Sequence, residues 1–294
     1  MRWKSLGAAF FLLLVCSISG FAYEWTYLGN PSLDPLRGLY FVNEYTGWAV
    51  GGPFINFPRF PSSVIVKTSD GGLTWQAQNS PVDVQLQEVI FYNGTLGWIA
   101  GDGVILNTKN SGENWTVQSI PSGAIVHYSD IAYYNSTTLF AVGWNGRILK
   151  TTNGGSLWTE QSSGTVALLE GIAVVNDRIA YVVGDGGLVL KTIDGGGRWD
   201  RQEELRSSFN IPLGLNDIQC FDSERCRIAA SNDHICTTTD GGSDWNCSRT
   251  GGVIGFGTLS YVDFDTGWVT GGAGGDLRYT DAGTWTTQTS DRPF

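Results

Sequence analysis

Short apolar runs follow one another along this chain, and each is bounded by glycine, asparagine or aspartate. Runs of about four to six aliphatic and aromatic residues predict β-strands, and the bounding residues predict tight turns. In one representative stretch, strands are expected at 89–92, 97–101, 104–107 and 115–118. Beyond residue 22 no segment has a helical pattern, so the sequence predicts an all-β protein.

One motif recurs in phase with these strands. A strand ends in threonine, a turn follows with Asp or Asn and glycine, and a tryptophan opens the next strand. The Asp or Asn side chain accepts hydrogen bonds from its own turn, and glycine supplies positive φ. We expect these residues to be structural rather than catalytic. They are Asp70, Trp75, Asn110, Trp115, Asn153, Trp158, Asp194, Trp199, Asp240, Trp245, Asp281 and Trp285.

The six tryptophans of this motif are 40 to 46 positions apart, which is the period of a β-propeller blade. The pattern therefore predicts a β-propeller of four-stranded antiparallel blades, with six complete repeats and a lone N-terminal outer strand at 23–28. A seven-bladed ring whose last strands are missing is the alternative. We expect a single propeller domain over 23–294.

The first 22 residues resemble a secretory signal peptide. Arg2 and Lys4 precede a short apolar run, and Gly20 and Ala22 occupy the positions that signal peptidase requires to be small. An uncleaved N-terminal anchor is the alternative. The segment predicts an extracytoplasmic protein, secreted or located in the periplasm, at the cell surface or, in a photosynthetic host, in the thylakoid lumen.

Charge narrows the range of partners. The chain has 294 residues and a net charge of −10, and it contains no run of Lys and Arg able to neutralise phosphates. Nucleic acid binding is therefore not expected. No cofactor or metal is expected. We expect a monomer that meets a membrane only through a partner.

Four cysteines lie in the fifth repeat. Cys220 and Cys226 flank one turn, and Cys236 and Cys247 flank another almost symmetrically. Each pair fits a cross-strand disulfide within one hairpin, as an exported chain permits. The alternative is a zinc site formed by all four cysteines, with His234 as a further ligand.

The repeat extends beyond the turn motif. Gly47-Trp48-Ala49-Val50-Gly51 is followed by Lys67-Thr68, and Gly97 to Gly101 and Gly267 to Gly271 repeat the theme. Over 23–288 the chain resembles the photosystem II stability/assembly factor family, built from BNR or Asp-box repeats. The resemblance implies a non-enzymatic propeller of photosynthesis that holds a partner protein while a membrane complex is assembled. The chain departs from the family's seven blades and from its arginine-rich patch.

Two groups of residues are not explained by the repeat. One is a set of candidates for partner binding, in a loop at 53–62 and in the turn after Gly143: Phe54, Phe57, Arg59, Phe60, Trp144 and Arg147. Exposed aromatic residues often mark interaction sites. The 53–62 loop folded back over its own blade is the alternative.

The second group stands at the start of the predicted innermost strands, where it would ring the mouth of the central channel: Arg37, Glu88, Asp130, Glu170 and Asp217. Such a ring could bind a cation or a basic peptide, or it could be ordinary solvated lining.

Two function classes remain. The first is a non-catalytic scaffold that binds a partner protein. The second is an Asp-box glycoside hydrolase, sialidase-like or xyloglucanase-like, or a carbohydrate-binding propeller. A sialidase-like site needs three arginines, and the innermost strands offer only Arg37. A hydrolase with two carboxylates would need Glu88, Asp130 or Asp217 to face one another across an open cleft. We expect no enzymatic activity.

Overall fold

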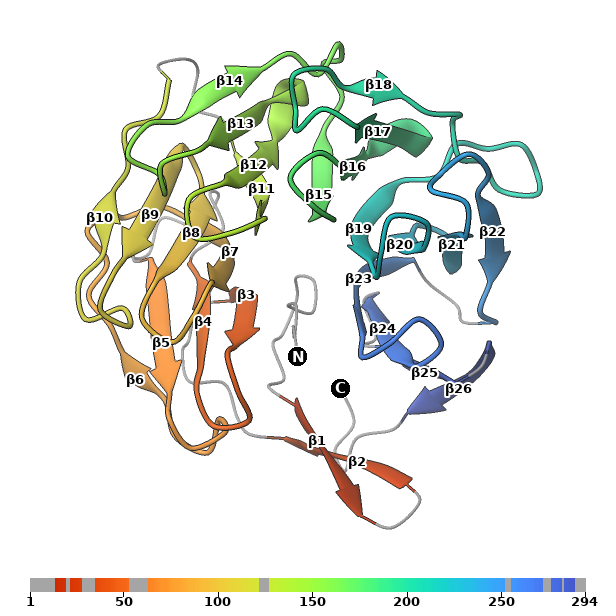
Figure 1. The fold of residues 1–294 in the computed structure, drawn as a ribbon. Coiled ribbons are helices and arrows are strands. Elements are labelled where there is room, and N and C mark those ends of the chain that lie inside the picture. The colour runs from red at the N-terminus through yellow and green to blue at the C-terminus, as the bar shows by residue number, and fades with distance from the viewer. Residues whose placement is uncertain are drawn as a thin grey trace.

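A computed structural model describes residues 35–52, 63–121, 127–251, 255–271, 276–281 and 283–288, together with strands at 14–19 and 22–27. Six four-stranded antiparallel sheets are arranged in a ring (Figure 1). The predicted all-β propeller of six four-stranded blades is confirmed. Among the described residues, no helix is long and apolar enough to cross a membrane.

Each blade is a meander from the centre of the ring to its rim (Figure 1). The innermost strands are β3 (Leu36–Phe41), β7 (Leu86–Phe91), β11 (Tyr128–Tyr133), β15 (Leu169–Val174), β19 (Leu215–Cys220) and β23 (Phe256–Tyr261). The second strands are β4 (Gly47–Gly51), β8 (Gly97–Gly101), β12 (Leu139–Gly143), β16 (Ala180–Gly184), β20 (Cys226–Ala230) and β24 (Gly267–Gly271).

The outer half of each blade completes the sheet. The third strands are β5 (Val64–Thr68), β9 (Val104–Thr108), β13 (Ile148–Thr151), β17 (Leu188–Thr192), β21 (His234–Thr238) and β25 (Asp276–Asp281). The outermost strands are β6 (Gln76–Ala77), β10 (Thr116–Val117), β14 (Thr159–Gln161), β18 (Asp200–Arg201), β22 (Asn246–Arg249) and β26 (Thr284–Gln288).

This meander gives the ring two faces. The turns between third and outermost strands, which hold the Asp or Asn motif, lie on one face, here called the corner face. The innermost strands begin on the opposite face, here called the mouth face, which also holds the turns between second and third strands. Two of those turns are short 3₁₀ segments, η1 (Trp144–Gly146) and η2 (Asp185–Gly187).

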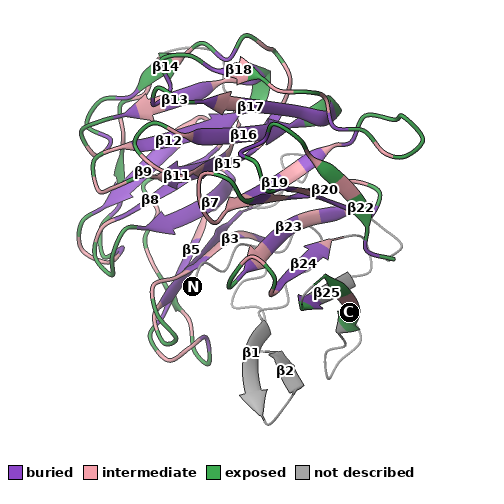
Figure 2. Cartoon of the chain, turned by 45° about the vertical axis from the view of Figure 1, so that its right-hand side comes forward, coloured by how far each residue is buried: buried purple, intermediate pink, exposed green. Residues whose placement is uncertain are grey.

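The core lies between adjacent blades. The second strands are buried almost throughout, whereas exposure increases toward the outermost strands (Figure 2). Trp48 is fully buried and stacks on Phe91 of the next blade, with ring centroids 3.6 Å apart. The Phe41 ring lies against Gly47, where a Cβ atom would come within 2.7 Å of it. This contact explains why glycine precedes tryptophan in the second strand.

Both predicted disulfides are present. Cys220 faces Cys226 across β19 and β20, and Cys236 faces Cys247 across β21 and β22. Directly opposed residues in an antiparallel pair bring their Cβ atoms close enough for a bridge. The four cysteines are therefore used within one blade, and the zinc alternative is wrong.

The N-terminal strand predicted to stand alone has a partner. It corresponds to β2 (Ala22–Tyr27), which pairs with β1 (Leu14–Ser19) in a two-stranded antiparallel sheet. Strand β1 falls within the predicted signal peptide. Cleavage after Ala22 would remove β1, so this pairing belongs to the uncleaved chain.

Candidate functional site

The corner face repeats one hydrogen-bonding pattern. In the first blade Thr68 Oγ1 donates to Asp70 Oδ1 at 2.8 Å and accepts from the Gly72 amide at 2.8 Å. Asp70 Oδ1 also accepts from the Thr74 amide at 2.9 Å. The Thr74 hydroxyl donates to Asp70 Oδ2 at 2.6 Å. This bond first, and then those from the Thr74 amide and the Thr68 hydroxyl, lower the pKa of Asp70 to about 2. The same pattern recurs around Asn110, Asn153, Asp194 and Asp240.

The corners also connect neighbouring blades. Trp48 Nε1 donates to the Ser111 carbonyl at 3.2 Å, and Trp98 Nε1 donates to the Gly154 carbonyl at 3.1 Å. Further round the ring, the Tyr181 hydroxyl donates to the Gly241 carbonyl at 2.7 Å. Aromatic residues of three second strands, β4, β8 and β16, therefore hold a corner of the next blade in place.

The last corner differs from the other five. Strands β25 and β26 form a tight hairpin in which Asp281 is paired with Thr284 within the ladder. Thr280 is buried, and its hydroxyl has no hydrogen-bond partner among the described atoms. The shortened motif therefore places Asp281 in a strand.

Strand register divides the five candidates at the channel mouth into two sets. Pairing between innermost and second strands shifts by one residue near the start of each blade, as in a β-bulge. Arg37 and Glu170 occupy the bulged position and are half-buried. Glu88, Asp130 and Asp217 come one residue later and are buried.

The buried carboxylates connect blades. Asp130 accepts from the Ile131 amide at 2.7 Å and from the Ile172 amide of the next blade at 2.9 Å. Asp217 accepts from the Thr258 hydroxyl at 2.8 Å and from the Leu259 amide at 3.1 Å, both in the next blade. The Ile218 amide also donates to the other oxygen of Asp217 at 2.8 Å, so the structure places Asp130 and Asp217 between blades and each accepts from backbone amides of both blades.

A second set of polar side chains gathers on the mouth face, here called the mouth cluster. It consists of Arg37, Asp102, His127, Trp144, Glu170 and Asp185. These residues come from the first four blades. They lie at bulges of innermost strands, at the start of β11, or directly after second strands.

His127 lies at the centre of the mouth cluster. Its Nδ1 is 2.5 Å from Asp102 Oδ1 of the preceding blade, and the two residues form an isolated antiparallel bridge. Gln87 Nε2 lies 3.5 Å from the same ring nitrogen. The centroids of the Trp144 and His127 rings are 5.1 Å apart, with the ring planes tilted relative to each other. Trp144 itself is 47% exposed.

The two candidates at the bulge differ in their electrostatic surroundings. Burial lowers the pKa of Arg37, and the negative charge of Asp102 acts in the opposite direction. Burial raises the pKa of Glu170, and the neighbouring carboxylate of Asp185 raises it further. His127 offsets part of the Glu170 shift. Glu170 and Asp185 therefore form a pair of like charges at this edge of the cluster.

The two sequence candidates after Gly143 have different surroundings. Trp144 is exposed to solvent on one side. Arg147 donates from Nε and Nη2 to the two oxygens of Glu160, both at 3.0 Å, and its side chain is only 13% exposed. That hydrogen bond raises the pKa of Arg147 and lowers the pKa of Glu160.

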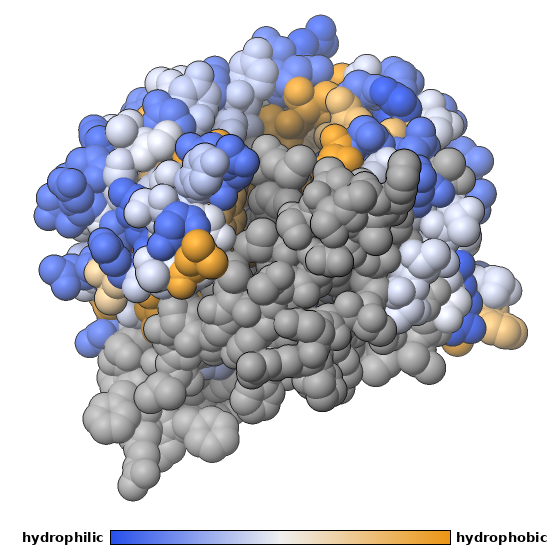
Figure 3. Space-filling view, turned by 90° about the horizontal axis from the view of Figure 1, so that it is seen from below, coloured by the Kyte–Doolittle hydropathy of each residue, from blue (hydrophilic) through white to orange (hydrophobic). Residues whose placement is uncertain are grey.

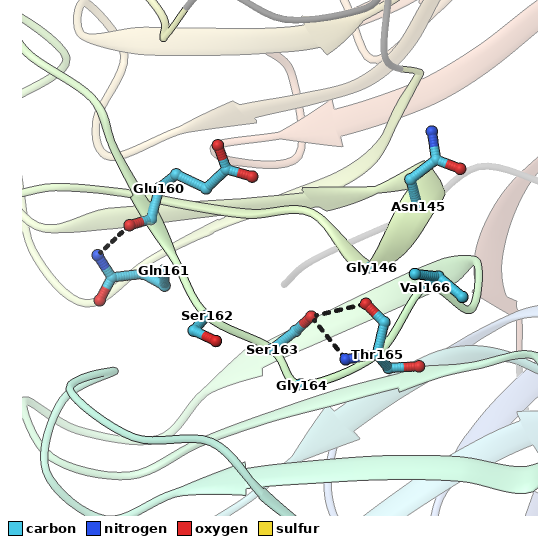
Figure 4. Close-up of a pocket in the computed structure, with 9 residues that line it drawn as sticks. All are labelled: Asn145, Gly146, Glu160, Gln161, Ser162, Ser163, Gly164, Thr165 and Val166. Carbon is cyan, nitrogen blue, oxygen red and sulfur yellow. Dashed lines mark hydrogen bonds between the residues drawn. The ribbon is translucent and has the colours of Figure 1, made fainter.

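A shallow recess of about 620 Å³ on the mouth face is bordered by Asn145 and Gly146, the two residues that follow Trp144. Figure 4 shows Asn145 and Glu160 on one side and the loop from Ser162 to Val166 on the other. Within the loop the Ser163 hydroxyl donates to the Thr165 carbonyl at 3.3 Å. The surface that lines the recess is about equally polar and apolar.

The loop candidates Phe54, Phe57, Arg59 and Phe60 lie outside the described residues. On the side shown in Figure 3, the described surface is mostly hydrophilic, with hydrophobic residues in small separate groups. The described residues include no group of three His, Cys, Asp or Glu arranged to hold a metal ion.

Sequence reasoning missed Asp102, His127 and Asp185. Asp102, Trp144 and Asp185 occupy the same repeat position, directly after the last residue of a second strand. Alignment of the repeats would have shown that this position follows a glycine in five of the six repeats, whereas the position itself holds Gly, Asp, Trp or Ser. His127 carries no such signal, because its partner Asp102 lies in another blade.

Fold and corners together define a six-bladed β-propeller of the Asp-box type. The family model described as photosynthesis system II assembly factor YCF48 matches residues 22–124 and 117–255. The chain belongs to this family, which confirms the resemblance seen in the sequence.

Solved structures show the same fold. One, "YCF48 bound to D1 peptide", has a TM-score of 0.70 and 20% identity, covering 97% of this chain and 88% of that chain. Another, the GH74 xyloglucanase from Xanthomonas campestris, has a TM-score of 0.73 and 12% identity, covering 91% of this chain and 50% of that chain. This chain therefore spans half of that enzyme. No curated protein matches the chain.

Proposed function

We propose that this protein is a non-catalytic, extracytoplasmic scaffold that binds a segment of a partner protein on its mouth face during assembly or stabilisation of a membrane or surface complex. The observation that carries the proposal is Trp144. It is a large aromatic side chain held at the surface against His127, within a cluster drawn from four blades. Exposed aromatic anchors of this kind dominate the energetics of many protein interfaces.

The family relation supports a protein partner. The family's description is an assembly factor, and a relative of the same fold is known in complex with a D1 peptide. An extended segment suits a propeller mouth, because several blades can contribute side chains to it. The partner of this chain is identified by the experiment below.

Two observations support an extracytoplasmic location. The N-terminal sequence has the pattern of a signal peptide, and both cysteine pairs of the fifth blade form disulfides. Disulfides persist in oxidising compartments. N-terminal sequencing of the protein from its host tests the location, with Tyr23 expected as the first residue. A mature chain that begins at Met1 would contradict cleavage.

The scaffold is favoured over the glycoside hydrolase. Asp130 and Asp217, two of the carboxylates on which a hydrolase would depend, accept backbone hydrogen bonds between blades. Glycosidases instead need two carboxyl groups that face the substrate across an open cleft. Hydrolysis of xyloglucan by the purified protein would overturn this choice.

The test compares two exposed side chains on opposite faces. Immobilised wild-type protein captures its partner from a host membrane extract, and mass spectrometry identifies it. Trp144→Ala should remove the partner, whereas Leu73→Ser, at a 73% exposed position on the corner face, should retain it. Both variants should melt within a few degrees of the wild type. Retention by Trp144→Ala would sink the mouth-face proposal.

A further inference from the structure

The mouth cluster combines an aromatic surface with unbalanced negative charge. Its ionisable members include three carboxylates, Asp102, Glu170 and Asp185, but only one arginine and one histidine. Asp102 contacts His127 and attracts Arg37. His127 offsets only part of the effect that burial and Asp185 have on Glu170, so Glu170 with Asp185 forms the negative edge.

Trp144 is the exposed surface next to that edge. The ring contacts His127 on one side and is 47% exposed, whereas the Trp residues of the motif have buried or half-buried side chains that pack within the ring of blades. Cations bind over the face of a tryptophan ring, and the stem of a lysine or arginine packs on it. The segment η1, which holds Trp144, contacts β15, which holds Glu170. The Asp185 amide donates to the Leu168 carbonyl at 3.0 Å, two residues before Glu170.

We propose that the mouth cluster binds a lysine or arginine side chain of the partner segment, with its stem on Trp144 and its cationic group at Glu170 and Asp185. This inference rests on the proposed function and specifies the chemistry of the partner. It separates this chain from a scaffold that would hold an acidic segment through arginines.

Two physical arguments support the assignment. A half-buried carboxylate beside a second carboxylate is stabilised when a cation approaches, because the cation offsets both burial and like-charge repulsion. The net charge of −10 further attracts cationic segments from a distance. A negatively charged ligand would be repelled by Glu170 and Asp185.

Trp144 also provides the readout. We would titrate the protein with a blocked peptide, acetyl-Gly-Lys-Gly-Lys-Gly-amide, and follow tryptophan fluorescence. Subtraction of the same titration in Trp144→Phe isolates the signal of this residue. The matched peptide with glutamate in place of lysine serves as the charge control, and spermidine serves as the free-amine control.

The decisive variant is Glu170→Gln combined with Asp185→Asn. Loss of a partly screened ion pair at each position should weaken lysine-peptide binding by about tenfold. The matched control is Glu113→Gln combined with Asp177→Asn, two exposed residues on the corner face. It removes the same charge from the chain and should leave the affinity within about twofold. Thermal melting should show that both double variants are folded.

The outcomes separate the inference from the function it rests on. Equal binding of the glutamate peptide, no binding of the lysine peptide, or an equal loss in both double variants would overturn the cationic assignment. If spermidine binds as tightly as the lysine peptide, the ligand of the mouth cluster is a free amine and the assignment of a peptide side chain is overturned. If partner capture remains dependent on Trp144 while the lysine peptide fails, the scaffold stands and only the assigned chemistry falls.

Discussion

The corner face and the mouth face are opposite edges of the same blades, yet their carboxylates behave in opposite ways. Hydrogen bonds from backbone amides and threonine hydroxyls lower the pKa values of Asp70, Asp194 and Asp240 on the corner face. Burial and Asp185 raise the pKa of Glu170 on the mouth face. Corner carboxylates are therefore satisfied within the chain, whereas the ionised form of the mouth carboxylate Glu170 would be stabilised by an added positive charge.

This contrast follows from repetition. A residue that returns in every blade with the same partners serves the ring, because each blade must solve the same turn and the same contact with its neighbour. Asp102, Trp144 and Asp185 share one repeat position, which therefore holds aspartate in two blades and tryptophan in a third. Because the residue at this position differs among the blades, packing within the ring does not determine it. This position therefore belongs to the candidate site and not to the framework.

Two tryptophans give the largest contrast. Trp98 is fully buried and donates to the Gly154 carbonyl of the next blade, so Trp98→Ala should lower the free energy of unfolding by about 3–5 kcal/mol. Trp144→Ala should change it by less than about 0.5 kcal/mol, because Trp144 is exposed. Urea denaturation followed by circular dichroism measures both. Similar losses in the two variants would break the comparison of faces.

The disulfides should contribute to the stability of the fold and not to peptide binding. Removal of the bridge between Cys236 and Cys247 by paired alanine substitution should cost about 2–3 kcal/mol of unfolding free energy, because the unfolded chain regains freedom. The mouth cluster lies in other blades, so lysine-peptide affinity should stay unchanged. Urea unfolding with and without reductant provides the measurement. A titration with a thiol reagent that detects four free thiols in the exported protein would contradict the bridges.

Asp217 and Glu170 differ by one step in strand register and should differ in effect. Asp217→Ala leaves the Thr258 hydroxyl and the Leu259 amide without their acceptor, which should cost about 1–3 kcal/mol of unfolding free energy. Glu170→Gln should leave stability nearly unchanged but weaken peptide binding. Paired denaturation and fluorescence titrations test this reversal. Weaker peptide binding in a folded Asp217→Asn variant would restore Asp217 to the ligand site.

The framework was predictable because its signals are local or periodic. The hydrogen bonds of the corner at Asp70 lie within the seven residues from Thr68 to Thr74, and Cys236 and Cys247 are placed symmetrically about a turn. The mouth cluster required strand register, since a one-residue bulge separates Glu170 from the position of Asp217. The ion pair of Arg147 with Glu160 also depended on the pairing of β13 with β14, which sequence spacing alone does not give.

Acid titration gives the smallest effect and separates the two faces directly. The raised pKa of Glu170 means that cation binding, which needs the ionised carboxylate, weakens as the pH falls through that pKa, above the ordinary glutamate value of 4.5. The groups facing Glu170 are Asp185, His127, Asp130 and Ser129. The contribution of Glu170 to the free energy of unfolding changes in the opposite direction. It increases as the pH falls, because a raised pKa means that protonation of Glu170 favours the folded state. For Asp70 the stabilisation holds above the ordinary value of 3.8 and is lost only as the pH falls toward about 2.

Lysine-peptide affinity measured from neutral pH down to about pH 4 should therefore fall by less than tenfold while the corners stay intact. The same series in Glu170→Gln is the control, because it lacks the carboxylate whose protonation is expected to weaken binding. Carbon-13 NMR of the Glu170 carboxyl should show a midpoint above 4.5, and addition of peptide should lower it, because a bound cation favours the ionised form. A Glu170 midpoint at or below 4.5, unmoved by peptide, would leave the mouth carboxylate no different from those of the corners.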